Sequence, residues 1–139
     1  MTAPANRISV DVQVESPLWN GADVRDVAER AARAALAAAG VAEGHLAVAL
    51  VGPEEIRRLN REQREIDQPT DVLAFPVDES PAAPGPRELG DVVVCPQQAS
   101  DLLEAVVHGV LHLCGYDHET DRGEMLRLQE QVLAELRAA

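Results

Sequence analysis

Residues 46–64 read LAVALVGPEEIRRLNREQR, an apolar run that passes through a Gly-Pro pair into a charged segment. The run at 46–51 predicts a short buried strand, and Gly52-Pro53 ends it. Pro53 and two acidic residues favour a helix over 54–64, because the helix dipole stabilises acids near its start. Its inward face is expected to carry Ile56, Leu59 and Gln63. A strand joined directly to a helix in this way is typical of a fold that mixes both elements.

The flanking sequence extends this alternation in both directions. Residues 8–14 alternate apolar and polar side chains, which predicts a half-buried strand, and 23–39 is an alanine-rich helix that Gly40 ends. Downstream we expect a strand at 72–75, a proline-rich exposed loop at 77–88, a strand at 92–95, and helices at 97–113 and 121–137. The last helix is expected to turn Met125, Leu128, Val132 and Leu136 inward.

The order β-α-β-α-β-β-α-α predicts one α+β domain over residues 1–139. Its mixed sheet of about four strands would be covered by helices. The two strands around the proline-rich loop are expected to be antiparallel.

Composition limits the classes of function. The chain has 24 acidic and 12 basic residues, all of the latter arginine, so its net charge is −12, and aromatic residues make up 2%. A broad nucleic-acid-binding face would need more basic and aromatic side chains, so any contact with RNA is expected to be local or assisted by a metal or partner. The sequence shows neither a membrane-spanning apolar run nor a signal-peptide pattern, which predicts a cytoplasmic protein without membrane contact.

Three of the four histidines fall in residues 108–118, HGVLHLCGYDH. His108 and His112 are four residues apart and would share one face of a helix. Gly115 can adopt the left-handed conformation that ends a helix, so His118 could return as a third ligand. Three imidazoles with one open position are typical of a catalytic zinc site.

Other residues near this window leave alternatives open. Asp117 either orients a ligand histidine or is only a turn residue. Cys114 should face away from the histidines into the core. Cys95 is also predicted in the core, with a position beside the site as the alternative, and His45 is expected at the surface.

The histidine spacing overlaps the signature of metzincin proteases. That signature needs a glutamate directly after the first histidine, as general base for the attacking water. Gly109 occupies this position, which argues against a peptidase.

Arg57, Arg61 and Arg64 would lie on one face of the helix at 54–64. The planar guanidinium fork suits phosphate, so this stripe is a candidate phosphate contact. Ordinary surface ion pairs with the nearby glutamates Glu54, Glu62 and Glu65 are the alternative. The segment 67–76 would either shape the rim of a pocket or only cap local structure.

These motifs together resemble the YbeY family of bacterial rRNA maturation factors, which are metal-dependent single-strand endoribonucleases. Residues 108–118 match the family pattern H-G-x-L-H-L-x-G-Y-D-H in full. Further family blocks are matched by Asn60 with Arg64, by 67–76, and by Leu89-Gly90-Asp91. Two departures are Gln63, where the family usually has tyrosine, and a shorter stretch between Cys95 and His108, which would affect substrate handling.

The resemblance implies a function and residues for it. His108, His112 and His118 would bind one zinc ion per chain, and Arg64 would be the important arginine that faces the metal cleft. In the mechanism that we expect, zinc and Arg64 contact the phosphate, and Asp71, Asp91 and Asp117 are candidates only for positioning. The substrate would be single-stranded RNA, namely ribosomal RNA at the 3′ end of the small-subunit molecule, in maturation and ribosome quality control. Either water or the RNA 2′-hydroxyl would be the nucleophile. The alternative is a non-catalytic, metal-stabilised ribosome-assembly factor that docks on the ribosome or its proteins.

Overall fold

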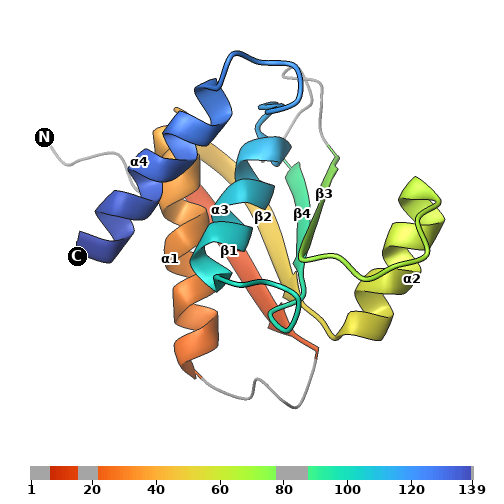
Figure 1. Ribbon diagram of the computed structural model, residues 1–139. Coiled ribbons are helices and arrows are strands. Elements are labelled where there is room, and N and C mark those ends of the chain that lie inside the picture. Colours follow the sequence, from red (N-terminus) through yellow and green to blue (C-terminus); the bar gives the residue numbers. More distant parts are fainter. Residues whose placement is uncertain (1–6, 16–21, 78–87, 139) are drawn as a thin grey trace, which may run out of the picture.

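The computed structural model describes residues 7–15, 22–77 and 88–138. Its elements confirm the predicted order (Figure 1). They are β1 (Arg7–Val14), α1 (Ala22–Ala38), β2 (Glu43–Leu50), α2 (Pro53–Arg64), β3 (Val72–Pro76), β4 (Glu88–Val94), α3 (Leu102–Leu113) and α4 (Glu124–Ala138). Nearly all of the predicted loop at 77–88 lies outside the described residues. In the described part, no helix has the length and apolar character needed to cross a membrane.

The strands form one mixed sheet in the order β1-β2-β4-β3. β1, β2 and β4 run parallel, whereas β3 pairs antiparallel with β4, as predicted for the strands that flank the loop. The parallel strands are joined by helical crossovers, which such a pairing requires. β1 and β3 are therefore the two edges of the sheet.

Helices cover the two faces of the sheet unequally. α1 and α3 pack against each other and against one face, and α4 packs on both of them (Figure 1). Val92 and Val94 point from β4 into this main core. Val93 and Cys95 point the other way, where they pack with Ile56 of α2 in a smaller cluster. The alternation along β4 follows from the two-residue period of a strand.

The sequence placed the starts of the last two helices too early. α3 begins at Leu102 rather than Gln97, because the Asp101 carboxylate accepts hydrogen bonds from the backbone N–H groups of Leu103 and Glu104 and so caps the helix there. α4 begins at Glu124 rather than Asp121. The Asp121 carboxylate accepts hydrogen bonds from Met125 and Gly123, and these bonds hold its pKa below the usual range.

The expected inward position of Gln63 is wrong, since its side chain is exposed. Ile56 is buried as predicted and Leu59 packs, partly buried, beside it, whereas the second buried residue of α2 is Asn60, four residues after Ile56 on the same face. The Asn60 amide donates a hydrogen bond of 3.0 Å to the backbone oxygen of Gln68, which holds the segment after the helix against it. Helix phase alone did not show this, because the position of that segment decides which face is covered.

Close packing of α3 on the sheet explains the glycine at position 109. A Cβ atom on Gly109 would lie 2.6 Å from a methyl group of Val92 and 2.7 Å from a methyl group of Val72. The helix can approach β3 and β4 this closely only without a side chain at this position. A glutamate, as in a metzincin, would not fit here without moving the helix.

Both cysteines pack in or against the core, as predicted, and the remaining histidine lies on the sheet. Cys95 is buried in the smaller cluster, and Cys114 packs, partly buried, against the main core. His45 lies partly exposed on the sheet, where Glu88 at 2.9 Å and Asp11 at 2.7 Å flank its two ring nitrogens. The hydrogen bonds to Glu88 and then Asp11 raise the pKa of His45.

Candidate metal centre

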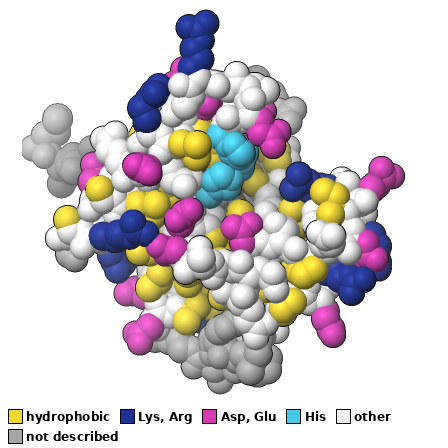
Figure 2. Space-filling view, in the orientation of Figure 1, with side chains coloured by type: hydrophobic (Ala, Val, Ile, Leu, Met, Phe, Trp, Pro, Cys, Tyr) yellow, Lys and Arg dark blue, Asp and Glu magenta, His cyan; other side chains and the backbone are white. Residues whose placement is uncertain are grey.

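The fold brings the three histidines of the window together. One ligand nitrogen from each of His108, His112 and His118 lies within 4.8 Å of the others, and each side chain is partly buried. α3 presents the first two on one face. Gly115, with φ of +99°, then turns the chain so that His118 faces them. Figure 2 shows the histidines gathered in one place on this face of the molecule.

The partners of the ring nitrogens prepare two imidazoles for a cation. The Nδ1–H of His108 donates to the side-chain oxygen of Gln129 at 2.8 Å, and that of His112 donates to the backbone oxygen of Tyr116 at 3.0 Å. In a neutral imidazole the other nitrogen, Nε2, then carries only a lone pair. The two Nε2 atoms lie 3.1 Å apart. Two lone pairs at this distance repel unless a cation lies between them, so the site fits a metal ion.

Burial keeps one of these rings in the form that metals require. Desolvation, followed by the nearby His108, lowers the pKa of His112. A neutral imidazole is the metal-binding form, whereas a protonated one must first lose its proton.

Gln129 is a site residue that the sequence analysis missed. It lies on α4 and is buried at 7% exposure, although it is polar. Its hydrogen bond fixes the ring of His108 and directs Nε2 toward the other histidines, as the outer partners of metal-bound histidines commonly do. A glutamine four residues after the inward-facing Met125 was the available signal, because a polar residue on a buried face needs a partner.

The three aspartates predicted as positioning residues differ in location. Asp71 and Asp117 line the cavity beside the histidines. The Asp117 carboxylate accepts a hydrogen bond of 3.0 Å from the backbone N–H of Glu119, which is the role of a turn residue. Asp91 does not line this cavity. It is exposed and precedes Val92, whose side chain faces α3, so the pleat of β4 turns Asp91 to the opposite face of the sheet.

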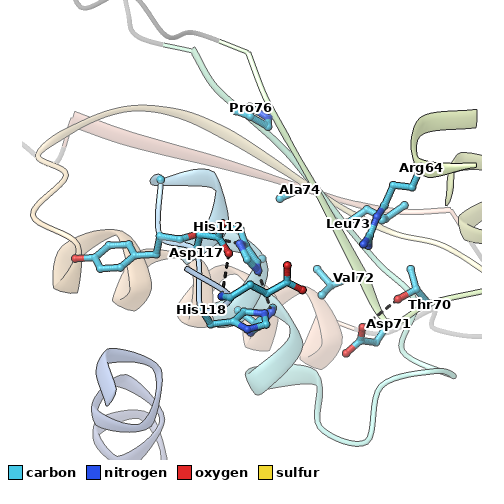
Figure 3. A pocket seen from close by; sticks show the side chains of 15 residues that line it. Arg64, Thr70, Asp71, Val72, Leu73, Ala74, Pro76, His112, Asp117 and His118 are labelled. Carbon is cyan, nitrogen blue, oxygen red and sulfur yellow. Dashed lines mark hydrogen bonds between the residues drawn. The ribbon is translucent and has the colours of Figure 1, made fainter. Parts of the chain in front are cut away.

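The histidines lie in an open cavity of about 600 Å³. One wall comes from α3 and the turn after it, and the other comes from β3 and Arg64 at the end of α2 (Figure 3). The cavity is large enough for a mononucleotide-sized part of a ligand. The polar residues Thr70 and Asp71 line the cavity just before β3, and the apolar residues Val72, Leu73, Ala74 and Pro76 continue the wall along the strand, so the 70–76 part of the predicted segment shapes the pocket.

The arginine stripe splits into paired and unpaired members. Arg57 donates to the Asp67 carboxylate at 2.8 and 3.2 Å, and Arg61 lies 3.8 Å from the same group. Arg64 makes no ion pair within the described part of the chain, and its side chain is exposed beside the cavity. A guanidinium with its donors unused can bind a phosphate there.

The arrangement places a triad of potential metal ligands across one cavity from the Arg64 guanidinium. Three histidines leave a further coordination position of a tetrahedral metal for water or substrate. Arg64 offers a second positive charge for an anionic group on the same ligand. This pair of features suits hydrolysis or transfer at a phosphate ester.

Comparison with known proteins agrees with this chemistry. Residues 10–137 match the family model described as Endoribonuclease YbeY. The chain is 42% identical to Endoribonuclease YbeY of Azorhizobium caulinodans, over 93% of this chain and 92% of the relative. It is 36% identical to the protein of the same name from Chelativorans sp., over 96% and 93% of the two chains. It also resembles the solution structure of TM1509 from Thermotoga maritima, with a TM-score of 0.56 and 30% identity, over 93% of this chain and 92% of that one.

The family model spans nearly the whole chain, and it includes the three histidines, Arg64 and the β3 segment. This chain is therefore a member of the YbeY family of endoribonucleases.

Proposed function

We propose that this protein is a zinc-dependent, single-strand-specific endoribonuclease of the bacterial cytoplasm. It acts on ribosomal RNA, in maturation of the 3′ end of the small-subunit molecule and in ribosome quality control. The observation that carries the proposal is the convergence of three histidines opposite Arg64, which forms no ion pair with another described residue, in one cavity. His108, His112 and His118 would hold one zinc ion per chain.

Zinc is the metal that this set of ligands favours. Three neutral imidazoles with an open position form the usual catalytic zinc site, whereas magnesium and calcium prefer oxygen ligands. A zinc ion held there would supply Lewis-acid polarisation of a phosphoryl oxygen and a nucleophile from water at neutral pH.

The residues of the chain perform the remaining work. Gln129 and the Tyr116 carbonyl hold two imidazoles in a single tautomer, so their lone pairs are already aligned. Arg64 binds the non-bridging oxygens of the scissile phosphate and stabilises the charge that develops on them. The open cavity would admit an extended strand, and its wall along β3 would orient the nucleotide beside that phosphate.

The low positive charge points to assistance in finding the substrate. Over the chain, acidic residues outnumber basic ones two to one, so long-range attraction to RNA is weak. We propose that docking on the ribosome or on a ribosome-associated protein brings the cavity to its substrate. A purified protein that binds ribosomes tightly but never cleaves RNA would instead indicate the non-catalytic assembly factor.

Cleavage of matched single-stranded and duplex RNAs tests the proposed function. The zinc-loaded protein is expected to cut the single strand at least roughly 10-fold faster, because a duplex holds its bases in pairs and is too stiff to follow the cavity. Ribosomal RNA precursors with an unprocessed 3′ end provide the second substrate. Equal cleavage rates for the single-stranded and the duplex RNA, or activity that persists in a metal-free preparation, would contradict the proposal.

Metal removal is expected to lower the thermal stability. A bound ion would connect α3 to the turn that carries His118, and a ligand at 100 times its dissociation constant adds about 2.7 kcal/mol to the stability of the native state. For a domain of this size, removal should lower the melting temperature by roughly 10 °C. Calorimetry with and without chelator measures this shift. In His118→Ala, which lacks one ligand, chelator should change the melting temperature little. An unchanged transition after verified metal removal would refute the connection.

A further inference from the structure

The two edge strands of the sheet differ in whether other side chains cover their outward backbone groups. At the β1 edge, arginines of α1 cover outward-facing backbone oxygens: Arg25 donates to the oxygen of Val12 at 2.8 Å, and Arg33 donates to that of Ile8 at 3.0 Å. Such covering prevents an edge strand from pairing with other chains. The β3 edge has no corresponding cover in the described part of the chain.

The hydrogen bonds to β4 show which groups of β3 point outward. The backbone oxygen of Asp71 accepts from Cys95 at 2.8 Å, and the N–H of Val77 donates to Leu89 at 3.3 Å. Because an antiparallel ladder alternates, the odd-numbered residues of β3 face β4 and the even-numbered ones face away. The N–H and C=O groups of Val72 and Ala74 therefore point outward. Pro76, which has no N–H, contributes only its backbone oxygen to this edge. No group among the described residues forms a hydrogen bond with these outward groups of Val72, Ala74 and Pro76.

This open edge borders the metal centre. Val72, Ala74 and Pro76 all line the cavity that holds the three histidines (Figure 3). A second hollow of about 360 Å³ continues from it along β3, and Gln63, Arg64 and Phe75 are among its lining residues. Ala74 and Arg64 line both hollows, so a ligand at the edge lies next to a phosphate held by Arg64.

The chemistry of the edge selects its ligand. The oxygen of Val72 is followed along the outward side by the N–H of Ala74, so the edge offers an acceptor beside a donor. A phosphate has only acceptors and would be repelled by the oxygen, whereas the Watson–Crick edge of a base carries donors and acceptors side by side. The partly apolar hollow between α2 and β3 gives the ring of a base a surface to lie against.

We propose that the free edge of β3 hydrogen-bonds the Watson–Crick edge of an unpaired base next to the scissile phosphate. This inference rests on the proposed endoribonuclease function and gives its selectivity a cause. In a duplex the same base groups are already paired, so only a single strand can use the Val72 oxygen and the Ala74 N–H. The protein would thus exclude duplexes chemically, in addition to excluding them by shape.

The test uses the variant Ala74→Pro, which lacks the outward N–H of residue 74 but keeps every hydrogen bond between β3 and β4. Proline is tolerated at such edge positions. Ala74→Ser keeps the N–H and is the matched control. The substrates are single strands of uridine and of N3-methyluridine, whose Watson–Crick edge is blocked. Either change, Ala74→Pro in the protein or methylation of the strand, removes one or two hydrogen bonds and should lower kcat/KM by roughly 10-fold, mainly through a higher KM. Anisotropy of the labelled strands in chelator gives a binding readout that needs no cleavage.

The two changes remove different hydrogen bonds of one paired contact: N3-methylation removes the bond to the Val72 oxygen, and Ala74→Pro removes the bond from the Ala74 N–H. They should nevertheless not act independently, because the methyl group and the proline ring each keep the base edge from approaching β3. Methylation of the strand is expected to lower kcat/KM about 10-fold for the parent and for Ala74→Ser. For Ala74→Pro it should lower kcat/KM almost no further. If the factors by which methylation and Ala74→Pro lower kcat/KM simply multiplied, the inference would be overturned. Binding and cleavage at parental levels by a folded Ala74→Pro protein would overturn it too. A variant that changed only the oligomeric state would assign the edge to pairing between protein chains and would also overturn it.

Two further outcomes have defined meanings. If Ala74→Pro fails to fold, the parent alone decides, because equal binding of the two strands would refute contact with the base edge. If the zinc-loaded parent cleaves neither strand, the proposed function fails. The anisotropy measurement then still shows whether the β3 edge distinguishes uridine from its methylated form.

Discussion

Replacing His112 by alanine is expected to eliminate stoichiometric metal binding and to reduce RNA cleavage by at least roughly 1,000-fold, or about 4 kcal/mol of transition-state stabilisation. The reason is that Nε2 of His112 lies 3.1 Å from that of His108, so its loss removes one side of the proposed ligand set. Metal analysis of the purified protein and single-turnover cleavage of a single-stranded RNA measure the two effects.

His45→Ala is the matched control for this change. His45 is the histidine outside the window, and its two ring nitrogens are already occupied by Asp11 and Glu88. Its removal should leave both metal content and cleavage near parental values. Full metal occupancy in His112→Ala would contradict the proposed site, and parental cleavage by that variant would show that the metal serves another purpose.

Replacing Arg64 by alanine is expected to lower cleavage by roughly 10-fold to 1,000-fold, or about 1.4–4 kcal/mol, with metal content and folding nearly normal. The effect follows if the unpaired guanidinium contacts a phosphate in the transition state. Arg64→Lys should restore little, because an ammonium group cannot make the forked contact. The rate per folded, metal-loaded molecule is the quantity to measure.

The other arginines of the same helix face are the controls. Arg57→Ala and Arg61→Ala remove equal charges, but these side chains interact with Asp67 rather than with the cavity. They should change cleavage little. If all three variants lost activity equally, general charge would explain the effect. If folded Arg64→Ala cleaved RNA at the parental rate, the phosphate contact would be refuted.

Local patterns in the sequence were sufficient for the order of elements and the fold class. The two-residue period of β1 and the apolar stripe of α1 are set by neighbours in the chain, which is why they could be predicted. The starts of α3 and α4 were less accurate, since each depends on which aspartate caps the helix. The histidine window was also local, because one helical turn and one glycine determine how its three side chains meet.

Only the tertiary structure separated residues that looked equivalent in sequence. Asp67 pairs with Arg57 rather than with Arg64 because the segment after α2 folds back along the helix, so Arg64 has no ion pair within residues 7–15, 22–77 and 88–138. Asp91 is turned from the cavity by the pleat of β4, and Gln129 reaches His108 because α4 packs on α3. β3 became an open edge because it pairs only with β4. Each outcome depends on contacts between distant parts of the chain, which a short sequence pattern does not encode, whereas the spacing of the histidines within one turn of α3 is encoded locally.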